Sequence, residues 1–531
     1  MPLSLKKNVI AEPAVAGWYA WSYLLPPHTL AKYLKNHYRT IVESYLDKPE
    51  THRTALKQAR FQGGPFVHEQ DGSYDKVRDW YGSSRERVAP LLELADAIDE
   101  LEQKILPDLT GASMESVYRR LPEPLAGRVE LFYNRDNRTP DYRFIEPLLY
   151  ASPYFDPGLQ QVRFSTIDRD ARQFALTTPV LAYTPDQVLV TVPLDSPLLD
   201  RVFAGGLGAG ELDRIVEDLG LDGQRAETFR GFFEETPAPV AGSPDAPDTI
   251  EYVGHACVFV RHRGTTFLVD PVISYSGYSH ESDGRFTFDD LPERIDYVMI
   301  THNHQDHMLL ETLLKIRHRV GRVVIAKSAN SSLVDPDLKR ILGSLGFHDV
   351  VELDDLESIG TPGGTITALP FLGEHGDIRI RTKCGWLLDL DGTRVLFAAD
   401  STNISPQLYA QVTATVGQVD TVFIGMESVG APVSWLYGPL FPEKLERKVD
   451  AGRRLKGSNF EQAAAIVDTL RAGRVYVYAM GQEPWLGAVM CVEYDETHPA
   501  MIDSDKLVAY VTERGGVAKR LFLNESIEVR P

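Results

Sequence analysis

Apolar residues recur with two different spacings in the first half of the chain. In residues 30–46 and 88–109 they lie three and four positions apart, which is typical of amphipathic helices. Residues 128–133 and 187–192 are rich in β-branched and aromatic side chains, which favour strands. The first half is therefore predicted to be an α+β domain.

The second half alternates short apolar runs with helical segments. Strands are predicted at residues 297–301, 323–326, 422–425 and 475–478, and helices at residues 309–320, 337–345, 407–416 and 460–470. Two hairpins are expected to turn at Arg263-Gly264 and at Asp391-Gly392. This order of elements predicts mixed sheets flanked by helices.

A proline-rich stretch lies between the two halves. Residues 234–249 hold several prolines among Ala, Gly, Ser and acidic residues, with no apolar period. We place a boundary near residue 245. Residues 1–245 then form the N-terminal domain and residues 246–531 the C-terminal domain.

Charge and cysteine content narrow the class of protein. The chain has 55 Lys and Arg against 75 Asp and Glu, a net charge of −20, which argues against general affinity for nucleic acid or anionic membranes. Its three cysteines show no CxxC spacing and cannot form a disulfide framework, which fits a reducing cytoplasm. Because no apolar stretch reaches about 18 uncharged residues, no membrane span is expected.

The chemistry concentrates in residues 301–307, Thr-His-Asn-His-Gln-Asp-His, directly after an apolar strand. His302, His304, Asp306 and His307 offer imidazole nitrogens and a carboxylate, which are ligands for divalent metals. Three of the chain's 14 histidines fall in this short segment, so a merely solvated polar loop is a poor explanation. The segment predicts a metal site at the end of a strand.

The HxHxDH pattern resembles the signature of the metallo-β-lactamase superfamily. Tyr252-Val253-Gly254-His255-Ala256 and Leu268-Val269-Asp270-Pro271 are similar in order and spacing to the first strands of that fold. The resemblance covers about residues 246–500 and implies an αββα sandwich with a dinuclear metal site. The fold class expected is thus α/β, with a metallo-β-lactamase sandwich preceded by an α+β domain.

The remaining ligands depart from the usual pattern of that superfamily. Asp400 matches its bridging Asp, and Glu374 stands beside His375 at the position of a later ligand. Where a last histidine is usual, residues 479–482 read Ala-Met-Gly-Gln. His498 is the one later histidine, and it stands in a polar loop, so it is a minor candidate. His375 is an alternative to Glu374 if the loop shifts by one residue.

A carboxylate-rich ligand set favours iron over zinc. Hard anionic oxygens stabilise higher oxidation states, and open positions accept dioxygen, as in di-iron carboxylate proteins. Zinc hydrolysis needs only a Lewis acid and an activated water, and this set does not forbid it. We therefore keep a zinc-dependent hydrolase as the alternative function, and an inactive metal-binding scaffold as a third.

The ligand substitution, the long N-terminal domain and the total length together resemble the di-iron β-hydroxylases of chloramphenicol-type antibiotic biosynthesis. The resemblance implies two iron ions bound by His302, His304, Asp306, His307, Glu374 and Asp400. It also implies dioxygen as co-substrate and an external electron donor or reductase. The glycine-rich residues 206–210 lack a GxGxxG register and a clear preceding strand, so no flavin or nicotinamide site is expected. The implied substrate is an aromatic aminoacyl group, para-aminophenylalanine, held as a thioester on the thiolation domain of a nonribosomal peptide synthetase.

Several residues outside the motif have two interpretations each. Glu427, at a strand end, is either a carboxylate that orients a ligand or relays a proton, or an ordinary salt-bridged acid. Asp270 is expected to support the metal loop without ligating, and His255 to be a capping or core histidine.

Two further groups concern partners. Residues 444–456 carry six basic and two acidic side chains, which fits docking of an acidic carrier or its pantetheine phosphate, or a solvated loop. Trp18, Tyr19, Trp21 and Tyr23 are expected in the core or at a dimer surface rather than in the site. The N-terminal domain is expected to serve homodimerisation or synthetase docking.

Overall fold

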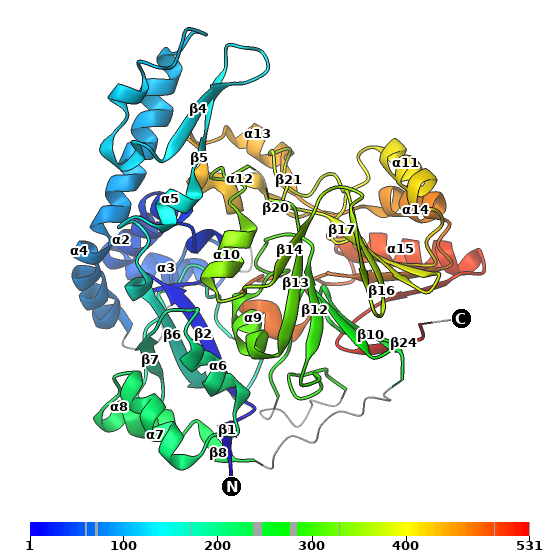
Figure 1. Ribbon diagram of the computed structural model, residues 1–531, viewed down its shortest axis with the longest axis horizontal. Coiled ribbons are helices and arrows are strands. Elements are labelled where there is room, and N and C mark those ends of the chain that lie inside the picture. Colours follow the sequence, from blue (N-terminus) through cyan, green and yellow to red (C-terminus); the bar gives the residue numbers. More distant parts are fainter. Residues whose placement is uncertain are drawn as a thin grey trace.

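The computed structural model describes residues 1–58, 61–68, 73–170, 172–236, 247–276, 284–328, 330–492 and 494–529. Its N-terminal domain is built on an antiparallel sheet in the order β3-β2-β6-β7 (Figure 1). These strands are β2 (Val9–Val15), β3 (Trp18–Tyr19), β6 (Gln160–Thr166) and β7 (Val188–Thr191). Two further pairs join β1 (Leu3–Leu5) to β8 (Phe233–Glu235) and β4 (Val129–Tyr133) to β5 (Pro140–Phe144).

Helices pack around this sheet, so the predicted α+β class is confirmed. They are α1 (Pro27–Tyr33), α2 (Arg39–Asp47), α3 (Pro49–Leu56), α4 (Ser73–Glu100), α5 (Glu146–Tyr150), α6 (Pro197–Ala204), α7 (Ala209–Asp218) and α8 (Gly223–Arg230). The helix predicted at 30–46 runs through α1 and α2, joined by a π-helical turn at Leu34–Tyr38. The helix predicted from residue 88 begins earlier, at Ser73. The prediction missed its first turns because they are mostly polar and show little apolar period.

The C-terminal domain consists of two seven-stranded sheets. The first has the order β14-β13-β12-β11-β10-β9-β24, and the second β15-β16-β17-β18-β19-β22-β23. The strands of the first are β9 (Thr249–Gly254), β10 (Cys257–His262), β11 (Thr265–Val269), β12 (Ile295–Ile300), β13 (Val320–Ala326), β14 (Val350–Leu353) and β24 (Glu525–Ile527). Those of the second are β15 (Ser358–Thr361), β16 (Gly364–Leu369), β17 (Gly385–Leu390), β18 (Thr393–Phe397), β19 (Thr421–Gly425), β22 (Arg474–Tyr478) and β23 (Val517–Arg520). Both predicted hairpins are present, as β10–β11 and β17–β18.

Alternating side chains divide the core into layers. On β12, Met299 faces the second sheet, whereas Val298 and Ile300 pack on the opposite side. On β19, Phe423 faces the first sheet and Ile424 faces the outer helices. Because the side-chain period of a strand is two, continuously apolar strands such as these are buried on both faces. The predicted αββα sandwich is confirmed.

Helices cover both outer faces of the sandwich. The first sheet carries α9 (Leu310–Ile316) and α10 (Leu338–Ser344), and the second carries α11 (Pro406–Val416), α14 (Phe460–Leu470) and α15 (Pro499–Glu513). Shorter elements lie near the site: β20 (Ala431–Pro432), α12 (Val433–Tyr437), α13 (Arg447–Gly452) and β21 (Arg454–Leu455). The N-terminal domain shares one hydrophobic core with α9 and α10, so it packs on that face of the sandwich.

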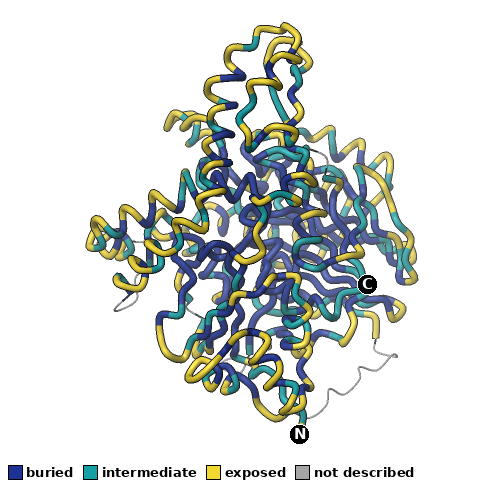
Figure 2. Tube along the Cα trace, turned by 60° about the vertical axis from the view of Figure 1, so that its left-hand side comes forward, coloured by how far each residue is buried: buried dark blue, intermediate teal, exposed yellow. Residues whose placement is uncertain are grey.

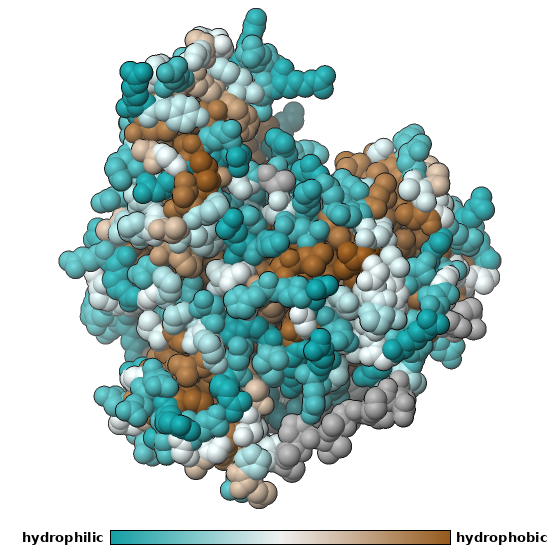
Figure 3. All heavy atoms as spheres, in the orientation of Figure 1, coloured by the Kyte–Doolittle hydropathy of each residue, from teal (hydrophilic) through white to brown (hydrophobic). Residues whose placement is uncertain are grey.

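The distribution of buried residues agrees with this layering. Buried residues fill the centre of the molecule and exposed ones its rim, including the projecting β4–β5 hairpin (Figure 2). The face of Figure 1 is mostly hydrophilic, with hydrophobic side chains reaching the surface near β14 and β17 (Figure 3). Among the described residues, no helix is long and apolar enough to cross a membrane. The predicted boundary near residue 245 lies outside the described residues.

Candidate metal centre

The histidine loop is placed by the end of a buried parallel strand. Strand β12 pairs with β11 on one side and β13 on the other, and ends at Ile300. Residues 301–307 therefore emerge at the carboxyl edge of the sheet, where loops of neighbouring strands gather. All seven residues of this loop are buried.

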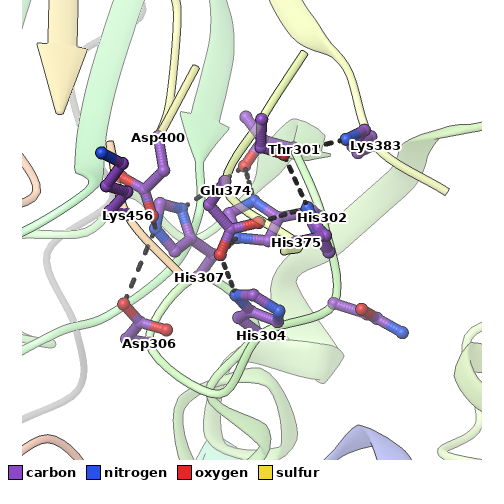
Figure 4. A network of polar contacts seen from close by, with 12 residues as sticks. Thr301, His302, His304, Asp306, His307, Glu374, His375, Lys383, Asp400 and Lys456 are labelled. Carbon is purple, nitrogen blue, oxygen red and sulfur yellow. Dashed lines mark hydrogen bonds and ion pairs between the residues drawn. The ribbon is translucent and has the colours of Figure 1, made fainter. Parts of the chain in front are cut away.

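The six predicted side chains converge around this loop (Figure 4), and one further histidine, His255, joins them. Their ligand atoms form three groups, in each of which the atoms lie within 4.8 Å of one another: His302, His304 and Glu374; His302, His307 and Asp400; His255, Asp306 and His307. Two of the groups share His302 and two share His307. The predicted residues are thus brought together, with a spacing suited to two adjacent metal ions.

Backbone strain helps to point these side chains inward. His255, Asp270, Glu374 and Ala399, which precedes Asp400, all have positive φ, between 41° and 63°. Such angles are uncommon for residues other than glycine and gather at functional sites. Each of these residues lies in a loop beyond a strand end, so several strand ends aim side chains at one point.

The electrostatics of the cluster favour a bound cation. Burial opposes charge on His307, but Asp400, Asp306 and Asp270 raise its pKa well above the ordinary value. Burial and the charge of His307 lower the pKa of His302 well below its ordinary value, so that ring is neutral. The site therefore stabilises positive charge beside Asp400, Asp306 and Asp270.

Atoms left without partners support the same conclusion. His302 Nε2 and Asp400 Oδ1 are buried and have no hydrogen-bond partner among the described residues. Leaving buried polar atoms unpaired costs about 1–3 kcal/mol each. A metal ion would satisfy both atoms, so the donor set fits the predicted dinuclear site.

Glu374 rather than His375 faces the cluster. One Glu374 carboxylate oxygen lies 2.6 Å from His304 Nδ1 and 4.0 Å from His302 Nε2. His375 contacts the other oxygen through Nδ1 and belongs to none of the three donor groups. Burial opposes ionisation of Glu374, but His304 and His375 hold its pKa well below the ordinary value. The carboxylate is therefore ionised and ready to bind a metal.

Asp270 supports the loop without joining the donor groups, as expected. It is fully buried, and its carboxylate accepts hydrogen bonds from the Thr301 N–H at 2.8 Å and the Thr301 hydroxyl at 2.7 Å. Its second oxygen also lies 2.8 Å from His307 Nδ1. This contact fixes the His307 ring with Nε2 toward Asp400.

His255 is more than the capping or core histidine expected from the sequence. Its Nε2 lies 3.1 Å from Asp306 Oδ2, which places it in the third donor group. Its Nδ1 accepts the Gly481 N–H at 3.1 Å. The available signal was its position directly after β9, at the same sheet edge as the histidine loop.

The segment that lacks the usual last histidine instead contributes that Gly481 backbone contact. His498, the minor candidate, belongs to no donor group: it caps α15 by accepting the Ala500 N–H, and its ring lies 4.3 Å from the Tyr494 ring.

Glu427 lines the metal cavity beside Tyr494. Burial, and then the charges of Asp400 and Asp306, raise its pKa to about 8. A carboxyl that holds its proton near neutral pH can donate as well as accept. Its predicted role as an orienting or proton-relaying group stays a prediction.

The N-terminal domain also reaches the metal cavity, whose volume is about 520 Å³. Gln62 and Gly63 line it, and the Gly63 carbonyl accepts a hydrogen bond from the Trp435 indole at 3.0 Å. Tyr437 places its hydroxyl oxygen 2.9 Å from His304 Nε2, and its ring lies 5.9 Å from that of Tyr23. As expected, the core contains the four aromatic residues Trp18, Tyr19, Trp21 and Tyr23, which are buried. Tyr23 also contacts Tyr437, which in turn contacts His304.

The basic run at 444–456 divides into two parts. Arg453 and Arg454 donate to backbone carbonyls at Gly376, Val429 and Gly430. The exposed side chains of Lys444, Arg447, Lys448 and Lys456 make no ion pair with the described residues. Of these, Lys456 lines the metal cavity.

Comparison with known proteins gives full-length matches. The model of the diiron non-heme beta-hydroxylase N-terminal domain matches residues 4–237, and that of the beta-lactamase superfamily domain residues 265–478. The 4-amino-L-phenylalanyl-CmlP-peptidyl-carrier-protein 3-hydroxylase of Streptomyces venezuelae is 58% identical over 533 residues, covering 100% of both chains. The crystal structure of a diiron beta-hydroxylase from Streptomyces venezuelae has a TM-score of 0.96 and 58% identity, covering 99% of each chain.

Proposed function

The chain belongs to the diiron non-heme β-hydroxylases, and from that premise we propose that it hydroxylates the β-carbon of a carrier-bound aromatic amino acid. The proposed substrate is L-para-aminophenylalanine, held as a thioester on the thiolation domain of a nonribosomal peptide synthetase. A relative that is 58% identical over its whole length acts on that group, as its name states. Family membership supports this hydroxylase and not the zinc-dependent hydrolase.

One structural observation supports this function best. The ionised Glu374 carboxylate, rather than an imidazole, stands between His302 and His304 at the floor of an open cavity of about 520 Å³. We therefore propose His302, His304, Asp306, His307, Glu374 and Asp400 as the iron ligands. His255, whose Nε2 approaches Asp306, positions that carboxylate or adds a further ligand.

The protein's own groups prepare this site. Two bound irons would supply the oxidation of the C–H bond by dioxygen, with electrons from an external reductase. Asp270 and Tyr437 fix the rings of His307 and His304, so the donor atoms are placed before a metal arrives. Glu427 holds a proton beside Asp400 near neutral pH, where it can orient a ligand or pass the proton on.

The carrier is proposed to dock beside α13. The exposed cations Lys444, Arg447 and Lys448 lie on or just before this helix, and Lys456 leads into the cavity. The pantetheine arm carries a phosphodiester, and Lys and Arg pair well with phosphate. We also propose that the N-terminal domain serves homodimerisation or synthetase docking, and that the enzyme works in the cytoplasm in chloramphenicol-type biosynthesis.

Metal analysis tests the centre first. Protein expressed with supplemental iron is expected to hold about two irons per chain, with a Mössbauer spectrum of a coupled pair. The reduced protein, mixed with dioxygen and a carrier loaded with 4-aminophenylalanine, is then expected to add one oxygen atom to the loaded carrier, seen by intact mass. Zinc binding with no iron uptake under any growth condition would contradict the proposal.

Charge reversal tests the docking surface. Lys448→Glu is expected to weaken carrier binding about tenfold at low salt, since reversal of one surface charge disfavours an anionic partner. The matched control is Arg214→Glu, an exposed arginine on α7, far from α13 (Figure 1). Equal effects of the two substitutions would contradict docking at α13.

A further inference from the structure

A second cavity, of about 560 Å³, adjoins the metal cavity. Both are lined by Gln62, Cys491, Val492 and Tyr494, so the two meet along a shared wall. Phe174 and Pro484 add apolar surface to the second cavity. The second cavity can therefore accommodate a flat ring that extends beyond the metal cavity.

Glu483 lines this second cavity and carries a carboxylate oxygen without a partner among the described residues. The residue is 3% exposed. Its Oε1 accepts hydrogen bonds from the Tyr252 hydroxyl and, at 2.8 Å, from the His255 N–H. Its Oε2 is buried without a partner among the described residues, and Glu483 lines the cavity. A fixed carboxylate with one free oxygen is an acceptor that awaits an N–H or O–H donor.

The distribution of charge gives the two cavities different roles. Lys456, which makes no ion pair with the described part of the chain, lines the metal cavity, so an anionic group is favoured on that side. In the second cavity, the charge of Arg172 is taken up by Glu12 and Glu311, at 2.9 Å each. Arg172 is therefore not available to bind a phosphate in the second cavity, and the Glu483 carboxylate would repel a phosphate there.

We propose that the second cavity is the subsite for the aromatic side chain of the substrate, and that Glu483 recognises an amino group on the ring. This inference rests on the proposed function. The substrate would lie with its β-carbon at the metal ligands and its ring between the shared wall residues. An arylamine is uncharged near neutral pH and keeps two N–H donors, one of which meets Glu483 Oε2.

Recognition of this kind discriminates against rings that lack the donor. A phenylalanyl group would leave the Glu483 oxygen desolvated and unpaired, which disfavours it. A hydrogen bond to a charged acceptor accounts for a factor of about 10 to 100 in kcat/KM. The unmodified enzyme is therefore expected to prefer 4-aminophenylalanyl over phenylalanyl carriers by about that factor.

The decisive variant is Glu483→Gln. Its side-chain oxygen can still accept from Tyr252 and His255, but an NH₂ group replaces the free oxygen and opposes the amine. We expect kcat/KM for the 4-aminophenylalanyl carrier to fall about 10- to 100-fold, and that for the phenylalanyl carrier to change less than about threefold. The matched control is Glu496→Gln, an exposed glutamate outside both cavities, for which both substrates should react as before.

The outcomes separate this inference from the proposed function. If Glu483→Gln slows both substrates equally while the unmodified enzyme is active, the inference is wrong and the proposed function stands. If the unmodified enzyme hydroxylates no carrier-bound amino acid, both are overturned. Should the variant fail to fold, the substrate preference of the unmodified enzyme decides: equal rates on both carriers would overturn the role of Glu483.

Discussion

Replacing Asp270 by Asn should weaken iron binding through a ligand that Asp270 itself only orients. An ionised carboxylate accepts hydrogen bonds and donates none. Asp270 therefore keeps a hydrogen on His307 Nδ1, 2.8 Å away, and leaves Nε2 to face Asp400. An amide NH₂ at this position would repel a hydrogen on His307 Nδ1, because both groups are donors. It would favour the tautomer with the hydrogen on Nε2, which is the nitrogen that must be free to bind a metal.

The size of the effect follows from the hydrogen bonds that the substitution removes. Asn retains one oxygen for the Thr301 N–H, so the loop keeps that anchor. The substitution removes the acceptor for His307 and for the Thr301 hydroxyl. Changes in groups that orient a metal ligand cost about 10- to 100-fold in metal affinity, or about 1.4–2.8 kcal/mol.

Competition with a coloured ferrous chelator measures this affinity. Asp296→Asn is the matched control, because Asp296 also accepts from a threonine N–H and hydroxyl, those of Thr266, but at the opposite end of β12. Thermal unfolding of the metal-free variants corrects for any loss of stability. An iron affinity for Asp270→Asn within about twofold of the unmodified chain would refute the reasoning.

Three further predictions concern stability. Burial raises the pKa of Glu146 to about 8, so the folded chain holds a proton that the unfolded chain releases above its ordinary pKa of about 4.5. The free energy of unfolding should therefore fall as pH rises from about 4.5 to 8. Glu146→Gln should make the free energy of unfolding, measured with urea, depend less on pH over that range. Gly430→Ala would place a Cβ 1.5 Å from the Leu455 carbonyl oxygen and should cost over about 3 kcal/mol; Gly206→Ala, with positive φ but no neighbour within 4 Å, should cost only about 1–2 kcal/mol in the same urea titration. Arg172→Met takes the arginine partner from the buried Glu311, whereas Glu12 keeps its pairing with Arg163. The substitution should cost about 3–5 kcal/mol in chemical denaturation; a loss under about 1 kcal/mol would contradict this.

Local signals predicted mixed sheets flanked by helices and a metal site at residues 301–307, whereas the sandwich itself was implied by the family resemblance. Apolar runs marked the strands, and turn residues such as Arg263-Gly264 marked the hairpins. The histidine loop at residues 301–307 could be found from its spacing after an apolar run, whereas Glu374 and Asp400 were assigned from the resemblance. Their roles as ligands stay predictions. The register of the sheets brings these residues together. No local signal predicts this arrangement, but the family resemblance implied it.

Contacts between distant segments could not be predicted in this way. The approach of His255 to Asp306 spans 51 residues and depends on β9 and β12 lying in one sheet. Gln62 and Gly63 line the metal cavity because the two domains pack against each other. The apolar pattern within either domain contains no information about that packing. The polar start of α4 was missed because an exposed helix needs little apolar surface.

The N-terminal domain also supports the histidine loop, in addition to Asp270. The Ser22 hydroxyl donates to the Asn303 carbonyl at 2.6 Å, within the loop itself. Glu311 on α9, which follows the loop directly, accepts from the Tyr19 hydroxyl at 2.9 Å and pairs with Arg172. A loop held by both domains has few alternative conformations, so its histidines lose little conformational entropy when a metal binds. The metal centre is therefore a product of both domains, although every proposed ligand comes from the second.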